Sequence, residues 1–380
     1  MGGALAGITT IDLSRMLPGP YCSMILADHG ARVIAIEDKR FLPDAVFLST
    51  VNRNKEHMTL NLKTKKGREI FLKLVEDADV LLEGFRPGVT KRLRVDYETI
   101  KEMNPRIIYC SITGYGQNGP YRDMAGQDVN YLSFAGILDL IGEKDGPPCI
   151  PGIQIADLVG GGMNAAIGIL LALVARERSG KGQYIDISMT DGMIGLLPVP
   201  LDFFQRYGKV PQKSDTLLSH RYACYNVYET ADERYISIGA LENRFWQNFC
   251  NVLGVPEYAP LQYDDDCREE ILEFFRKVFK KKTLEQWIKE LGDKDVCWGK
   301  VQSFTEILND PLFRARDMVG EVKNDSGEPE TVLGIPVKLS DTPGSVRKAS
   351  VGFGESTRKI LGELGYADDQ IEEFFEKGII

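Results

Sequence analysis

Asp157 is the residue whose position best suits chemistry, because it separates a short apolar run from a long one. Residues 153–156 have the composition of a strand end, and residues 158–178 that of a helix. A carboxylate at this junction would receive backbone N–H groups and the positive end of the helix dipole, which would keep it ionised. Glycines at 160–162 would leave room for a ligand. An ordinary helix N-cap fits the same pattern, so the residues alone leave both interpretations open.

Residues 111–128 form a second candidate region, SITGYGQNGPYRDMAGQD, rich in glycine, tyrosine and polar side chains. The segment follows a predicted parallel strand, where α/β folds commonly bind ligands. Its length favours a binding role over a simple connection, although a plain loop is the alternative.

Basic residues are frequent in the first half of the chain and could clamp the phosphates of a nucleotide-bearing ligand. They are Lys39, Arg40, Arg53, Lys55, Arg86, Lys91 and Arg92. Solvated surface charge is the ordinary alternative for any one of them.

Several other chemistries lack their motifs. The sequence has no Walker loop, no GxGxxG opening a helix and no GxSxG elbow. It contains three histidines, and its seven cysteines are scattered without a CxxC pair. We therefore expect no metal site, no dinucleotide cofactor and reduced thiols.

Strand and helix patterns alternate in the first half, which predicts a parallel sheet covered by helices. The expected strands are residues 8–13, 31–36, 80–82, 106–112 and 183–189. The expected helices are residues 18–27, 64–77, 90–103 and 158–178. Beyond residue 205, paired strands at 220–229 and 234–238 precede helices at 243–253, 268–280 and 283–291, which predicts a smaller α+β domain. Two further helices are expected within residues 356–380.

Bulk properties narrow the function classes. A chain of 380 residues is expected to form more than one domain. The net charge of −9 and the pI of about 5.2 argue against nucleic-acid binding. The N-terminus does not resemble a secretory signal, and residues 158–175 are expected to be a buried core helix and not a membrane span. We expect a cytoplasmic protein.

Long segments of the chain resemble class III CoA-transferases of the CaiB/BaiF type, a family that includes α-methylacyl-CoA racemases. The matching segments are DLSRMLPGPYCSMILADHGARVIAIE (12–37), NRNKEHMTLNLKTKKGRE (52–69), DVLLEGFRPGV (79–89), NPRIIYCSITGYGQNGPY (104–121), residues 155–189 and residues 360–380.

The resemblance implies a Rossmann-like large domain at residues 1–205, a small α+β domain at 206–330 and a C-terminal segment, 331–380, that returns to the large domain. It implies an interlocked homodimer, with a heteromer containing a related subunit as the alternative. The implied substrates are an acyl-CoA and a carboxylic acid. Coenzyme A enters as a thioester substrate, and no tightly bound cofactor is expected.

The resemblance also assigns chemistry to Asp157. In the transferases the matching aspartate attacks an acyl-CoA thioester, which gives an aspartyl anhydride and then an aspartyl-CoA thioester. In the racemases an aspartate and a histidine exchange the α-proton of the acyl group. Gln127 occupies the histidine position here, and a neutral amide cannot remove that proton. Glu242 matches the racemase pattern and is expected to shape the site with Gln127.

The resemblance carries the expected CoA contacts onto Phe85, Arg86, Arg92 and Tyr115, with Lys39, Arg40 and Lys55 as further contacts. Asp38 stands where the family has an arginine, so Lys39 or Arg40 would have to replace it. The leading hypothesis is an acyl-CoA:carboxylate CoA-transferase acting through Asp157. The alternatives are a 2-methylacyl-CoA racemase or epimerase and a non-catalytic subunit that binds CoA thioesters.

Overall fold

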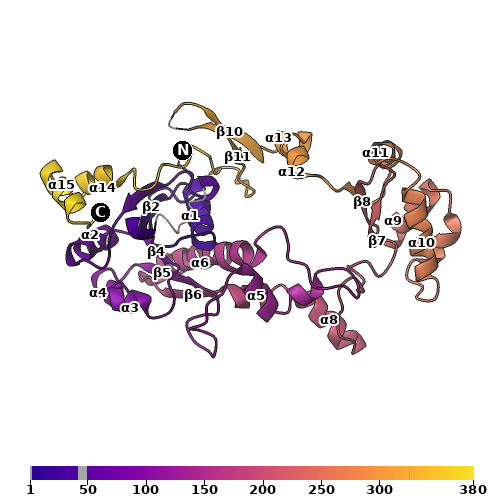
Figure 1. Cartoon of the computed structure of the whole chain (residues 1–380), viewed down its shortest axis with the longest axis horizontal. Helices are drawn as coiled ribbons and strands as arrows, with labels where there is room; N and C mark the ends of the chain where they lie inside the picture. Colours follow the sequence, from indigo (N-terminus) through magenta and orange to yellow (C-terminus); the bar gives the residue numbers. More distant parts are fainter. Residues whose placement is uncertain (1, 42–48, 325) are drawn as a thin grey trace. The chain divides into compact units, whose positions relative to one another are not determined.

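The computed structural model describes residues 2–41, 49–324 and 326–380, which pack as two compact units (Figure 1). The first unit comprises Met1–Ile137, Pro151–Leu197 and Pro311–Ile380. The second comprises Leu138–Ile150 and Pro198–Asp310. These units are defined by packing, so the domain boundaries expected at residues 205 and 330 stay a prediction.

A six-stranded parallel sheet forms the centre of the first unit, in the order β3-β2-β1-β4-β5-β6. Its strands are β1 (Thr9–Asp12), β2 (Arg32–Glu37), β3 (Glu56–Thr59), β4 (Val80–Glu83), β5 (Ile108–Thr113) and β6 (Tyr184–Ser188). The order of the strands along the chain reverses at β1: β2 and β3 are added on one side of it, and β4, β5 and β6 on the other. In α/β folds, ligands bind at the carboxyl ends of the strands at such a point. The predicted α/β class with a Rossmann-like parallel sheet is confirmed.

Helices and one hairpin complete the first unit. They are α1 (Pro18–Asp28), α2 (Lys65–Glu76), α3 (Val89–Leu93), α4 (Tyr97–Met103), α5 (Asp128–Phe134), η4 (Ala156–Met163), α6 (Asn164–Ser179), α7 (Met189–Ile194), α13 (Pro311–Ala315), β10 (Val319–Lys323), β11 (Pro329–Leu333), α14 (Thr357–Glu363) and α15 (Asp368–Glu376), with short 3₁₀ turns η1 (Lys39–Phe41) and η2 (Ser49–Val51). Ile360, Leu361, Ile371 and Phe374 of the two last helices join the same core as the strand residues Ile11 and Leu81.

The predicted helix over residues 90–103 is two helices. Arg94 adopts a left-handed conformation with φ of +59° and ends α3. The side chain of Asp96 then caps α4 by accepting from the backbone N–H of Thr99. Strand β3 was not predicted, because its sequence EHMT lacks an apolar alternation; its register beside β2 pairs Ile34 with Glu56.

The helix expected after Asp157 starts as the π-helix η4 and continues as α6. The glycines of η4 allow this helix to lie close to α1 and α7. A Cβ at Gly161 would lie 2.8 Å from Cβ of Pro18, and one at Gly160 would lie 2.6 Å from the carbonyl oxygen of Met189. The expectation that these glycines leave room for a ligand is therefore wrong, because protein atoms fill the space.

The segment Ala156–Ser179 is long and apolar enough to cross a membrane by length and composition alone. One face of α6 packs against the sheet and α1, and the side chains buried there are Ala165, Ala166, Ile169 and Ala172. Apolar side chains on other faces are exposed: Ile167, Leu170, Leu171 and Val174. The expected buried core helix is therefore buried on one face only in the single chain.

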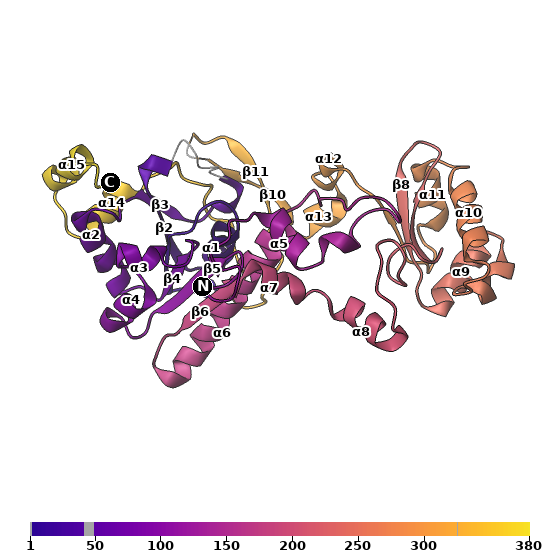
Figure 2. The same cartoon turned by 60° about the horizontal axis from the view of Figure 1, so that its bottom comes forward.

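The second unit has its own α+β core. Its antiparallel sheet, ordered β7-β8-β9, contains β7 (Tyr225–Glu229), β8 (Tyr235–Gly239) and β9 (Trp298–Lys300). Its helices are η3 (Leu138–Leu140), α8 (Pro198–Tyr207), α9 (Asn243–Val252), η5 (Pro256–Leu261), α10 (Arg268–Phe279), α11 (Leu284–Leu291) and α12 (Phe304–Ile307). Helices α9, α10 and α11 lie beside the small sheet (Figures 1 and 2), where Trp246, Phe275 and Trp287 are buried.

Candidate active site

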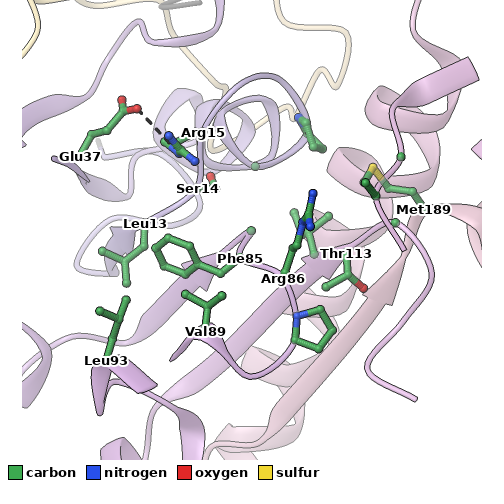
Figure 3. Close-up of a pocket in the computed structure, with 18 of the residues that line it drawn as sticks. Leu13, Ser14, Arg15, Glu37, Phe85, Arg86, Val89, Leu93, Thr113 and Met189 are labelled. Carbon is green, nitrogen blue, oxygen red and sulfur yellow. Dashed lines mark ion pairs between the residues drawn. The ribbon is translucent and has the colours of Figure 1, made fainter. Parts of the chain in front are cut away.

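A cavity of about 850 Å³ opens at the carboxyl ends of the parallel strands in the first unit. The ends of β2 and β5 and the loops that follow β1 and β4 form its walls, and they contribute Arg15, Glu37, Phe85, Arg86 and Thr113 (Figure 3). The cavity thus lies at the reversal point that the sheet order indicates for ligand binding.

The cavity wall is strongly cationic. The basic residues that line it are Arg15, Arg40, Lys63, Arg86, Arg92 and Arg122. Arg15 lies 4.0 Å from Glu37, and Arg40 pairs with Asp38. Lys63, Arg86 and Arg92 form no ion pair with any residue that the structure describes. Unpaired cations around a cavity are suited to phosphate groups. Sequence reasoning missed Lys63, because a lysine in a run such as NLKTKKG resembles ordinary surface charge.

One part of the wall is apolar. The ring of Phe85 lies among Leu13, Val89 and Leu93 (Figure 3), and it packs against the core beneath the cavity. Its backbone N–H donates to the buried carboxyl group of Glu83 over 2.7 Å. Burial raises the pKa of Glu83 to about 7. This contact fixes the start of the loop that carries Phe85 and Arg86.

Tyr115 follows β5 and also lines the cavity. Its ring packs edge-on against Tyr131 and Phe134, with centroids 5.3 and 5.4 Å away. Its buried hydroxyl has no hydrogen-bond partner among the described residues. Gln127 follows on the same loop, lines the cavity and precedes α5.

A backbone hydrogen bond connects Asp157 to the segment that carries Gln127. Asp157 donates its backbone N–H over 3.0 Å to Oδ1 of Asp128, the residue after Gln127. Within the described chain its carboxylate accepts no hydrogen bond, so the expected backbone contacts are not formed. Burial, followed by the charge of Asp128, raises the pKa of Asp157 to about 6. Most of the group is still ionised at neutral pH.

Electrostatics and packing link Asp157 to the cavity, although the residue does not itself line it. Tyr131 lines the cavity, and its pKa is raised to about 12 by burial and then by the charge of Asp157. The helix η4 also contacts α1 and α7 through Pro18 and Met189, both of which line the cavity. Asp157 is partly exposed and lies close to Tyr131 of the cavity wall.

The structure gathers six of the predicted residues at the cavity: Arg40, Phe85, Arg86, Arg92, Tyr115 and Gln127. It does not bring Lys55 and Lys39 there. Lys55 is buried, where its ammonium donates to the carbonyl of Pro20 over 2.7 Å. Lys39 lies over the ring of Phe375 at 4.6 Å. Glu242 precedes α9 in the second unit, and its role at the site stays a prediction.

No group of three or more His, Cys, Asp or Glu side chains within the described residues could hold a metal ion. The cations of the cavity wall instead suit a ligand that carries phosphate groups, and the carboxyl group of Asp157 lies near this wall.

The model of the CoA-transferase family III matches residues 5–357. The chain belongs to this family. A protein of Fusarium pseudograminearum named acyl-CoA transferase is 34% identical over all of this chain and 88% of its own length. The human α-methylacyl-CoA racemase is 33% identical over 99% of this chain and 97% of its own. A CaiB/BaiF family protein from Brucella suis has a similar structure, with a TM-score of 0.83, 30% identity, and coverage of 96% and 100% of the two chains.

Membership confirms the resemblance and the enzyme class: this is an enzyme of CoA-transferase family III, whose members use CoA thioesters. The relatives bear names of two different activities, a transferase and a racemase. Family membership therefore leaves the choice between these reactions to the residues of the site.

Proposed function

We propose that this enzyme is an acyl-CoA:carboxylate CoA-transferase in which the carboxylate of Asp157 is the nucleophile. The observation that carries the proposal is the hydrogen bond from Asp157 to Asp128, because it places the carboxylate of Asp157 beside the segment that has Gln127 where a racemase would need a histidine. The carboxylate of Asp157 accepts no hydrogen bond within the described residues, and Gln127, which precedes its partner Asp128, is an amide. None of the described residues lining the cavity is a histidine. A two-base proton exchange would lack its second base at this position.

The reaction is a series of acyl transfers. The Asp157 carboxylate attacks the thioester carbon of the donor; the C–S bond breaks, and CoA leaves as a thiolate. The thiolate attacks the carbonyl carbon of Asp157 in the mixed anhydride, releasing the donor acid and forming an aspartyl-CoA thioester. The acceptor carboxylate attacks this thioester and expels the thiolate. The thiolate then attacks the acceptor's acyl carbon, giving the new acyl-CoA and restoring Asp157. No step requires net proton transfer.

The wall of the cavity supports the binding of CoA. Lys63, Arg86 and Arg92 supply unpaired positive charge for the phosphates, with Arg40 as a further contact. Phe85 and Tyr115 supply aromatic surface. In this proposal Gln127 orients the acyl carbonyl by hydrogen bonding, and Glu242 completes the site. Lys39 and Lys55 are not needed as CoA contacts.

The pKa of Asp157 favours a second candidate, a racemase or epimerase. A carboxyl group with a pKa of about 6 is a competent general base. It could remove an α-proton by itself and return it to either face of the enolate. The two candidates differ in whether an acceptor acid is required.

One assay in deuterated water separates the candidates. Acyl-CoA donors are incubated with the enzyme, with and without carboxylic acid acceptors, and the CoA esters are followed by mass spectrometry. The transferase predicts new CoA esters that appear only with an acceptor and carry no deuterium at the α-carbon. Deuterium incorporation without any acceptor would reject the proposal in favour of the racemase.

We also propose a cytoplasmic homodimer with no tightly bound cofactor. The exposed apolar face of α6, with Ile167, Leu171 and Val174, supports burial against a second chain. Mass photometry at nanomolar concentration would show a dimer; a monomer there would contradict this assembly. A heteromer with a related subunit would instead require that partner for activity.

A further inference from the structure

A second cavity, of about 380 Å³, lies at the opposite end of the parallel sheet from the candidate active site. Its wall includes Ala31 and Arg32 at the amino end of β2, whereas Glu37 at the carboxyl end of the same strand lines the active-site cavity. Five residues of a strand separate the two ends by roughly 16 Å. The second cavity is therefore a separate place on the first unit.

Two basic residues in this wall are balanced by carboxylates. Arg32 pairs with Glu56 at 2.7 Å and with Glu363, and Lys359 pairs with the same two carboxylates. These four charges cancel. Lys55 also borders the cavity, with its ammonium bonded to the carbonyl of Pro20.

Two other basic residues are not balanced. Arg347 and Lys348 line the cavity and form no ion pair with any residue in the described parts of the chain. The guanidinium of Arg347 donates to the carbonyl of Ala27 over 2.8 Å, which orients it and leaves other N–H donors unused by carboxylates. Lys348 makes no side-chain hydrogen bond within the described residues. Arg347 and Lys348 thus each supply a positive charge to the cavity that no carboxylate in the described parts of the chain pairs with.

The backbone that carries these cations is held by Asn54, whose φ of +61° is uncommon for a residue with a side chain. Its Oδ1 accepts from the N–H groups of Arg347 at 2.8 Å and Lys348 at 3.0 Å. Its Nδ2 donates to Asp28 over 2.7 Å, and Asp28 is paired with the buried Arg53 at 2.7 Å. The backbone at both residues and the guanidinium of Arg347 are therefore positioned before any ligand arrives.

We propose that this second cavity binds a small oxyanion with two or more negative charges through Arg347 and Lys348. A phosphate ester and a polycarboxylic acid share this chemistry, because an arginine fork and a lysine ammonium recognise both kinds of oxygen. The volume suits a small ligand and is below half that of the active-site cavity. The inference concerns the first unit alone and does not depend on the proposed transferase reaction.

Isothermal titration calorimetry on the full chain tests the proposal, and the Arg92→Gln variant is titrated in parallel because it alters only the active-site cavity. Sodium pyrophosphate and citrate are titrated separately to distinguish phosphate from carboxylate ligands. We expect one site per chain for at least one of the two probes. Lys348→Gln and Arg347→Gln should each weaken binding about tenfold, the usual effect of losing one charge-assisted hydrogen bond.

Lys181→Gln is the matched control, because Lys181 is an exposed lysine of the same unit that does not line either cavity. It should leave the dissociation constant unchanged. Lys348→Gln removes no side-chain contact seen in the structure, so its folding is not at risk. Absence of binding by both probes, or equal affinity of the wild type and the Lys348→Gln variant, would overturn the proposal.

Discussion

The carboxylate of Asp128 accepts the backbone N–H of Asp157 over 3.0 Å. This contact fixes the start of η4 beside the cavity, and it also places a second negative charge near the proposed nucleophile. The charge adds to burial in raising the pKa of Asp157 to about 6. A more basic carboxylate is a better nucleophile, but it becomes protonated under mildly acidic conditions.

Replacing Asp128 by asparagine should therefore move the pH dependence of the reaction. The asparagine oxygen can still accept from the N–H of Asp157, while the charge is removed. Since a nearby negative charge raises a carboxyl pKa, the acidic limb of kcat/KM, centred near pH 6 in the wild type, should move to lower pH. A pH–rate profile for both proteins measures the shift. An acidic limb that stays in place would show that Asp128 does not tune this group.

Loss of a cation from the cavity wall should weaken CoA binding. We expect Arg92→Gln and Lys63→Gln each to raise KM for the acyl-CoA about tenfold with a smaller change in kcat, because each removes one charge-assisted contact remote from the reacting carbon. Steady-state kinetics at two salt concentrations check this, with Lys181→Gln as the control for net charge. Unchanged KM values in both variants would place the phosphates elsewhere.

Lys55 should behave as a structural residue. Its pKa is lowered by burial to about 8, and the charge of the buried Asp12 opposes that shift. Lys55→Met would remove a positive charge that acts on the buried Asp12 and would leave the carbonyl of Pro20 without its donor, which we expect to cost about 3 kcal/mol of unfolding free energy. Urea unfolding measures the loss, and calorimetry with coenzyme A measures affinity. Weaker CoA binding without a loss of stability would restore Lys55 as a ligand contact.

Glu83 should make stability depend on pH. Its pKa is raised by burial from 4.5 to about 7, so the folded state favours the protonated form. The stability contributed by this proton is complete below pH 4.5 and is lost as the pH rises through 7. Glu83→Gln imitates the protonated form and can keep the bonds to Phe85 and Ser111.

The Glu83→Gln variant should therefore unfold at a higher temperature than the wild type at pH 8, by an amount corresponding to at most about 3 kcal/mol, and at a similar temperature at pH 5. Calorimetric Tm values across this range test the expectation. A variant that is less stable at pH 8 would show that the carboxylate form is preferred inside the fold.

Sequence periodicity predicted most of the strands and helices, because apolar runs such as 31–36 and 80–82 form buried parallel strands. It missed β3, whose short sequence is polar. It also joined α3 and α4, because the left-handed turn at Arg94 has no glycine to mark it.

The site was predictable only where a residue's role follows from its own neighbourhood in the chain. Arg86 and Phe85 lie directly after β4, so their place at the sheet edge follows from the strand. The contact of Asp128 with Asp157 joins residues 29 positions apart and depends on packing between α5 and η4. Lys55 could not be separated from the surface lysines, because burial depends on the position of α1 above it.

Chemical trapping of Asp157 tests the central claim most directly. The enzyme is mixed with an acyl-CoA donor, without acceptor, and quenched with hydroxylamine, which converts an aspartyl anhydride or thioester to a hydroxamate. Peptide mass spectrometry then locates the modified residue, with Asp157→Asn as the control. We predict a hydroxamate at Asp157 that requires the donor. Turnover with Asp157 unmodified, together with full activity of the Asp157→Ala variant, would contradict covalent catalysis by this carboxylate.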